Sequence, residues 1–560
     1  MRPLRLNQAI TIALALCVGV FFASCRISSE DLDTWKGTVK GPGKILAVML
    51  ANKYDIGLRQ HAAWTLIDME RQDFDGLAEL QRAIQRLDEE TRKQIIQGLL
   101  PLLEKRLKEK TDPKDEDPSM GAAPYQVRAK DAAFMLAGFA DREARAQLTE
   151  AIIHWYVEDF ERRSLAGNFS AEQVVRGLGA PAAGVLVGAL STRLPQQALI
   201  KLSELIGQLG NPEAKKKAGQ RLVQIESEMQ GEEFRKWLRD GITKQLSGKG
   251  GKPDPSLVLR AIERNQHKFT IEGAIPAMKF LASQKEVAKR LVAIASTGKI
   301  DPAVIQQRVS AVPGLNETDR TKLVQNLVNL SISQLNERRV AALQALEGNA
   351  LKEHLKPLLS LALDPGNPAA VRDYAFDRVG DIRSPDSIRP MWALVQDAKN
   401  NRLRWRAGEL VLAIGGNRVL SEFFSKLPSG PRVKYEPEEL EGYASRLSQM
   451  NPLPREAAKT QLNSPDWWDQ VIAIKFLERR GTEKDIVLLQ QLQNNDTEVE
   501  GKGWPKGETV GKVAESALAS LRERLKQAAG MVSREARNSG KKALVNRKSN
   551  KKSDDTAVRK

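Results

Sequence analysis

Cysteine is the scarcest informative residue in this chain, with only two among 560 residues, Cys17 and Cys25. Both lie within the first 25 residues, so the remaining 535 can form no disulfide, cysteine zinc site or cysteine nucleophile. A long stretch without thiols suits an oxidising compartment, because nothing in it can form a wrong disulfide.

Histidine is nearly as rare, with four residues spread along the chain: His61, His154, His267 and His354. No two have the short spacing that places a pair on one helix face for a metal, and no nucleophile elbow or zinc-protease motif occurs. The glycine-rich stretch 248–252 lacks the spacing of a phosphate loop and is better interpreted as a linker. We therefore expect no catalytic, cofactor-binding or metal site, and a protein that is not an enzyme.

Aromatic residues make up only 5% of the chain, whereas alanine and leucine are plentiful. Apolar residues recur three and four positions apart in segments separated by short breaks of Gly, Pro, Asn or Asp, and no convincing strand alternation occurs. The sequence therefore predicts an all-α protein packed through small and γ-branched side chains.

The first 25 residues carry an export pattern. Arg2 and Arg5 precede residues 9–23, which contain no charge. This run is shorter than the roughly 20 apolar residues that cross a bilayer, and its length is typical of a signal peptide. The following cysteine is preceded by Phe22-Ala23-Ser24.

Residues 22–25 resemble the lipobox of bacterial lipoproteins, although Phe22 occupies the position that usually holds leucine. The resemblance implies cleavage between Ser24 and Cys25 and attachment of a diacylglyceryl lipid, with palmitate as a typical acyl chain, to Cys25. Arg26 rather than aspartate follows, which by the same analogy implies an outer-membrane lipoprotein facing the periplasm. An ordinary secretory signal and an uncleaved anchor are the alternatives.

A helix-turn-helix unit is clearest in residues 367–395. The first helix contains Val371-Arg372, Ala375 and Val379-Gly380-Asp381, and the second contains Ile388, Pro390, Leu394 and Val395. Residues 403–424 repeat the pattern, and weaker copies begin near residues 55, 127, 471 and 513.

These residues resemble a HEAT repeat, the helix pair of armadillo-like proteins. The resemblance implies a right-handed α-solenoid in which pairs stack every 40 to 47 residues or so and bind a protein partner along a concave face. It also implies a structural role for the arginines that follow apolar residues at the repeated position, which bond to the neighbouring turn. These are Arg59, Arg128, Arg372 and Arg404.

Two further motifs favour structural interpretations. Trp467-Trp468 follows Ser464-Pro465-Asp466 at an expected helix start, so we expect packing rather than an exposed anchor. The adjacent carboxylates Glu89-Glu90 and Glu438-Glu439 diverge on a helix, and we expect them on solvated faces.

The net charge of +17 is concentrated at the C-terminus, since residues 522–560 alone carry +9. The tail lacks apolar periodicity and is predicted to be disordered. An exported tail could contact an anionic envelope lipid or polymer, although simple solubilisation is the alternative and nucleic acid is an unlikely target. The candidate contacts are Lys541, Lys542, Arg547, Lys548, Lys551 and Lys552.

The chain is therefore predicted to divide at its breaks. We expect a signal peptide (1–24), a linker after the lipidated cysteine (25–44), HEAT-like repeats (45–246), a Gly/Pro linker (247–256), further repeats (257–425), a loop with a short helix (426–456), final repeats (457–525) and the basic tail (526–560). The leading hypothesis is a lipid-anchored scaffold for protein binding in the cell envelope. A lyase-type HEAT-like enzyme and a nucleic-acid-binding solenoid are the alternatives.

Overall fold

A computed structural model describes residues 27–529 except 70, 72, 111, 113, 118–120, 159–162, 164–170, 248–252, 299, 398–400 and 431–432. The signal peptide, the cleavage position Ser24, the lipidation position Cys25 and the basic tail from residue 530 onward lie outside the described residues. Predictions about them are not tested by this structure.

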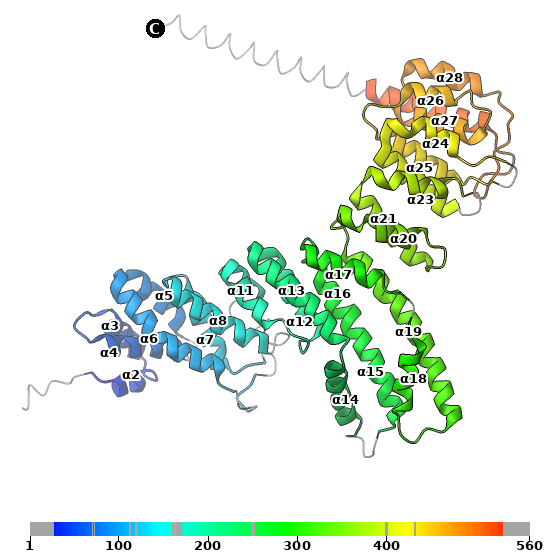
Figure 1. Cartoon of the computed structure of the whole chain (residues 1–560). Coiled ribbons are helices and arrows are strands. Elements are labelled where there is room, and N and C mark those ends of the chain that lie inside the picture. Colours follow the sequence, from blue (N-terminus) through cyan, green and yellow to red (C-terminus); the bar gives the residue numbers. More distant parts are fainter. Residues whose placement is uncertain are drawn as a thin grey trace, which may run out of the picture. The chain divides into compact units, whose positions relative to one another are not determined.

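Two compact units form the chain: unit 1 spans Met1–Leu291 with Lys299–Ala341, and unit 2 spans Val292–Gly298 with Ala342–Lys560. Helices α17 (Lys285–Ala295) and α19 (Glu317–Ala345) each include residues assigned to both units. The helices of both units are labelled in Figure 1, where colour follows the sequence.

Unit 1 consists of helices that follow one another with short connections. They are α2 (Ser29–Trp35), α3 (Gly41–Leu50), α4 (Ile56–Asp68), α5 (Gly76–Arg86), α6 (Glu89–Lys108), α7 (Pro124–Ala137), α8 (Arg142–Glu158), α10 (Ala171–Leu178), α11 (Ala180–Ala189), α12 (Gln196–Leu209), α13 (Pro212–Met229), α14 (Glu232–Ser247), α15 (Pro255–Phe269), the π-helix η1 (Thr270–Ala274), α16 (Ile275–Lys279) and α18 (Pro302–Ser310).

Unit 2 is built in the same way. Its elements are η2 (Lys352–His354), α20 (Leu355–Leu363), α21 (Ala369–Ile382), η3 (Pro385–Ser387), α22 (Ile388–Val395), α23 (Asn401–Gly415), η4 (Gly416–Val419), α24 (Leu420–Lys426), α25 (Pro437–Ser448), α26 (Arg455–Gln461), α27 (Trp467–Arg480), η5 (Glu483–Asp485) and α28 (Ile486–Leu492), followed by a helix at 510–529.

Local sequence explains where many of these helices begin. The side chains of Asp55, Asp75, Asp88 and Asn211 each accept a hydrogen bond from a backbone N–H in the first turn. Such a cap stabilises a helix by about 1 kcal/mol. Polar residues in the breaks between apolar segments therefore mark the positions where these helices begin.

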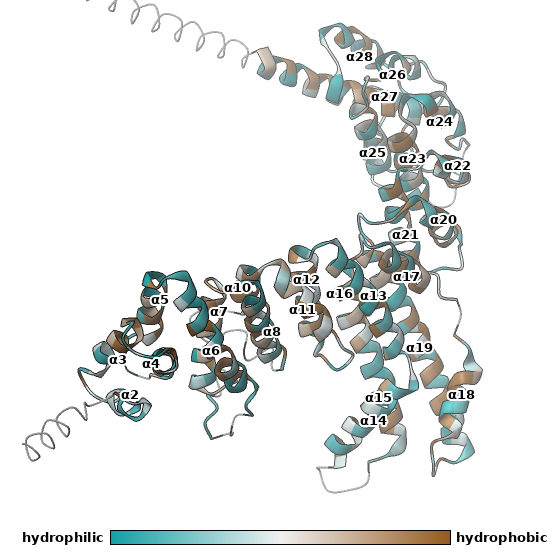
Figure 2. Cartoon of the chain, turned by 60° about the vertical axis from the view of Figure 1, so that its left-hand side comes forward, coloured by the Kyte–Doolittle hydropathy of each residue, from teal (hydrophilic) through white to brown (hydrophobic). Residues whose placement is uncertain are grey.

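Each unit buries its apolar residues between stacked helices. Helix α3 packs on α4, α6 on α8 and α11 on α12 in unit 1, whereas α20 packs on α21 and α22 on α23 in unit 2. Apolar and polar stretches alternate around the helices in Figure 2. Only isolated bridges between single residues occur in place of strands among the described residues. The prediction of an all-α solenoid is confirmed.

Two of the repeated arginines, Arg59 and Arg372, tie their helix to the end of the helix before it. Arg59 Nε donates to the Met49 carbonyl at 2.8 Å, and Arg372 Nε donates to the Ala362 carbonyl at 3.1 Å. Both acceptors lie at the C-terminal end of the preceding helix, where carbonyls lack helical partners. The structural role predicted for these two arginines is confirmed.

Candidate protein-interaction surfaces

None of the predicted site residues falls in the described part of the chain, so the candidate surfaces come from the structure itself. The four histidines are separate from one another: His61 contacts Asp33 at 3.0 Å, and His267 contacts Glu337 at 2.8 Å. Among the residues that the structure describes, no cluster of His, Cys, Asp and Glu could hold a metal ion. In the same residues, no helix is long and apolar enough to cross a membrane.

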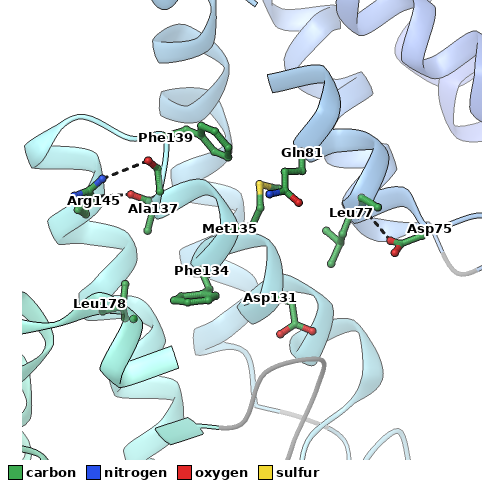
Figure 3. A pocket seen from close by; sticks show the side chains of 13 residues that line it. Asp75, Leu77, Gln81, Asp131, Phe134, Met135, Ala137, Phe139, Arg145 and Leu178 are labelled. Atoms are coloured by element: carbon green, nitrogen blue, oxygen red, sulfur yellow. Dashed lines mark hydrogen bonds between the residues drawn. The ribbon is translucent and has the colours of Figure 1, made fainter. Parts of the chain in front are cut away.

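Unit 1 contains a cleft of about 510 Å³ between α5, α7 and α10. We call this the apolar cleft. Half-buried apolar side chains supply most of its wall (Figure 3): Leu77, Phe134, Met135, Phe139 and Leu178.

The apolar cleft stays open because of a glycine on α10. A Cβ atom at Gly177 would lie 2.8 Å from Cζ of Phe134, which is too close for an unaltered packing. At the other end, Arg145 Nε donates to the Ala137 carbonyl at 2.7 Å and holds the C-terminal end of α7 in place. The absence of a side chain at Gly177 thus leaves room for the Phe134 ring at the cleft wall.

A buried ion pair lies beneath the apolar cleft on α7. Lys130 is completely buried, and its Nζ lies 2.5 Å from Oδ1 of Asp131, which lines the cleft. Burial lowers the pKa of Lys130, and the Asp131 carboxylate opposes that change. Removing either charge would take away a close opposite charge from the other in a site shielded from water, which is destabilising.

Unit 2 contains a larger groove of about 1100 Å³, which we call the polar groove. It lies at the C-terminal ends of α21, α23 and α25, and residues 449–452 form part of its wall. The charged side chains that line it are Glu347, Asp377, Arg378, Asp381, Arg383, Arg406, Glu409, Arg418 and Arg446.

Ion pairs between successive helices cross this region. Arg406 on α23 binds Asp373 at 2.9 Å and also binds Asp377, both on α21. Arg446 on α25 lies 3.9 Å from Glu409 on α23. Half-buried charges of both signs therefore lie together on α21, α23 and α25.

Arg404 on α23 and Glu439 and Tyr443 on α25 form a buried cluster. Arg404 Nε and Nη2 donate to the two carboxylate oxygens of Glu439 at 2.7 and 2.6 Å, and Tyr443 Oη donates to the same carboxylate at 2.9 Å. Burial raises the pKa of Glu439, and the bonds from Arg404 counteract this. The expectation that Glu439 is solvated is wrong, because an arginine on the neighbouring helix compensates its charge. Glu89, Glu90 and Glu438 are exposed as expected.

Aromatic side chains pack against this cluster. The Tyr435 ring stacks on Trp468 at 5.1 Å, and the Arg404 guanidinium lies 4.3 Å from the Tyr435 ring centre. Trp467 packs edge-on against Trp468 and Trp504. The packing role predicted for the tryptophan pair at the start of α27 is confirmed.

No protein-family model and no curated protein sequence matches the chain. The structure is similar to that of the karyopherin Kap121p bound to the SUMO protease Ulp1p, with 13% identity and a TM-score of 0.31 over 89% of this chain and 45% of that one. Importin beta also matches, with 10% identity and a TM-score of 0.19 over 88% of this chain and 76% of that one. A Kap121p mutant matches over 92% of this chain and 53% of its own length, with 12% identity and a TM-score of 0.27. The chain thus spans about half the length of the Kap121p structures.

The sequence predicted neither the apolar cleft nor the polar groove. The residues that line them come from separate helices, and no motif joins them in the sequence. The only local signals are Phe134-Met135 on the exposed side of one helix and the Gly415-Gly416 pair at the end of another.

Proposed function

We propose that this protein is an exported scaffold that is lipid-anchored through Cys25 at the outer membrane of a bacterial envelope, and that it binds a partner protein through unit 1. The lipobox-like residues 22–25 support the anchor. The apolar cleft carries the case for protein binding, because solvent-accessible aromatic and methionine side chains on a rigid scaffold are typical of interface cores.

The residues of the apolar cleft suit an apolar anchor side chain better than a reaction. Its charged groups are already engaged: Asp131 with Lys130, and Arg145 with backbone carbonyls. No observation on the described residues favours the enzyme alternative. The half-buried charges on α21, α23 and α25 are of both signs, so they do not favour the nucleic-acid alternative either.

Membrane attachment is tested by replacing Cys25 with serine. We expect the wild-type protein to carry a lipid on an N-terminal Cys25 by mass spectrometry and to fractionate with membranes. Cys25→Ser should release it into the soluble fraction. An unmodified N-terminus at another residue would overturn the anchor.

Partner binding is tested by crosslinking in intact cell envelopes, with Phe134→Ala compared against Phe280→Ala. Phe280 is 38% exposed and does not line the apolar cleft, so it is a matched control. A buried aromatic anchor is typically worth about 2 kcal/mol or more, so Phe134→Ala should reduce the crosslinked partner by roughly thirtyfold. Equal recovery with both variants would contradict a role for the apolar cleft.

A further inference from the structure

Five arginines and four carboxylates, Glu347 among them, line the polar groove, so its charges do not cancel. Asp377 is paired with Arg406, Asp381 with Arg378 at 3.0 Å, and Glu409 lies near Arg446. Two exposed arginines that line the groove, Arg383 and Arg418, make no hydrogen bond or ion pair with any described residue. The groove therefore presents two guanidinium groups that are free to bind an anion.

The backbone places both arginines at the ends of helices that border the groove. Arg383 is the C-cap of α21 and has a left-handed φ of 50°, so its side chain starts beyond the last turn of the helix. Arg418 lies in η4, directly after α23. Asn417 between α23 and Arg418 donates to the Pro452 carbonyl at 2.9 Å, which holds this segment against the opposite wall.

The size and the mixed charge of the groove restrict what it can bind. At about 1100 Å³ it exceeds the roughly 300–1,000 Å³ of small-molecule sites. A nucleic acid or another continuous polyanion would bring phosphates close to the carboxylates of Asp377, Asp381 and Glu409. A polypeptide can instead place a few carboxylates at the arginines and offer its backbone amides elsewhere.

We propose that the polar groove binds an acidic segment of a polypeptide, with its carboxylates held by Arg383 and Arg418. Arginine suits this role because its planar guanidinium forms paired hydrogen bonds with a carboxylate. The amide side chain of Asn451 also lines the groove and is available for backbone contacts, as is Nε2 of Gln449, whose Oε1 accepts a hydrogen bond from Arg446 at 3.3 Å. This inference extends the proposed scaffold function to a second docking site and to a defined partner chemistry, but it does not depend on export or lipidation.

Fluorescence anisotropy on the purified full-length chain tests the proposal. The probes are a short labelled peptide rich in Glu and Asp, the same peptide with Gln and Asn, and a labelled single-stranded oligonucleotide. The double variant Arg383→Ala/Arg418→Ala is compared with Arg389→Ala/Arg522→Ala, which removes two exposed arginines outside the groove and has the same net charge.

We expect the acidic peptide to bind wild type and the control variant equally, and the groove variant at least about tenfold more weakly. The amide peptide should bind weakly to all three proteins. Equal binding of the acidic peptide to both variants, or no binding to wild type, would overturn the proposal.

Tighter binding of the oligonucleotide than of the acidic peptide, lost in the groove variant, would show a polyanion site and also overturn it. Because the measurement uses purified protein and leaves the apolar cleft unchanged, its failure is distinguishable from failure of envelope crosslinking through Phe134.

Discussion

The apolar cleft of unit 1 and the polar groove of unit 2 are built by the same kind of architecture and differ in chemistry. Both lie where three helices of successive pairs come together. In unit 1 these helices present Phe134 and Met135, whereas in unit 2 they present Asp377 and Arg406. A repeated helix stack thus supplies recesses, and the few residues that line each recess determine what it can bind.

The two regions also differ in what lies beneath them. The apolar cleft rests on alanine-rich packing with a single buried ion pair, Lys130 with Asp131. Unit 2 instead buries the Arg404–Glu439–Tyr443 cluster and the acid Asp469. We therefore expect the region around α23, α25 and α27 in unit 2 to be more sensitive to loss of a polar group and to pH than the region beneath the apolar cleft.

The largest effect is expected from Glu439→Ala. The substitution leaves the buried Arg404 guanidinium without its carboxylate, and breaking such a pair costs about 3–5 kcal/mol. The loss is measured as the change in the free energy of unfolding of unit 2, with urea unfolding monitored by hydrogen exchange. The neighbouring exposed residue provides the control, since Glu438→Ala should change stability by less than about 0.5 kcal/mol. Similar losses in both variants would show that the cluster does not set unit 2 apart.

A pH effect of somewhat smaller size is expected from Asp469 on α27. Burial raises the pKa of Asp469 to about 7. The negative charge of Asp466 raises it further, whereas the hydrogen bond that the Ser464 hydroxyl donates to Asp469 lowers it. Because its folded pKa lies above the unfolded value of about 3.9, the unfolding free energy falls as pH rises between those values, by about 2–4 kcal/mol in total.

Asp469→Asn should remove this pH dependence, as measured by urea unfolding at a series of pH values from 4 to 8. The exposed residue Asp496 serves as the control, since Asp496→Asn should leave the dependence in place. A slope that is unchanged in Asp469→Asn would assign the sensitivity to another group.

Filling the apolar cleft should affect binding more than stability. Gly177→Ala places a methyl group against Phe134 and narrows the cleft, so it should reduce crosslinking of the partner in cell envelopes. The crowding should lower the free energy of unfolding by about 1 kcal/mol. Gly184→Ala on α11 meets no atom within 4 Å and should instead stabilise the helix by about 0.5–1 kcal/mol without affecting crosslinking. Unreduced crosslinking of Gly177→Ala would place the partner elsewhere.

The smallest stability effect is expected at the polar groove. Arg418→Ala removes an exposed side chain that makes no hydrogen bond or ion pair with any described residue, so the unfolding free energy should change by less than about 0.5 kcal/mol, as measured by thermal and urea unfolding. A larger loss would mean that Arg418 supports the fold, and weaker peptide binding by its variants would then need another explanation.

Local sequence determined much of the fold. Asp55 and Asn211 start helices through their own side chains, and the pattern in residues 367–395 contains α21 and α22 as expected. Periodicity, capping and helix-breaking residues act over a few positions, so they can be recognised without knowledge of distant parts of the chain. The export pattern of residues 1–25 is likewise a local feature, and it remains a prediction.

The tertiary structure alone decided which charges are buried and where the recesses lie. Glu438 and Glu439 are adjacent and chemically identical, yet one is exposed and the other binds Arg404 on a neighbouring helix. Gly177 matters only because α10 brings it against Phe134, and Arg383 and Arg418 share a groove only because α21 and α23 end side by side. Burial and pairing depend on which helix faces lie against each other, and that is set by the packing of the whole stack.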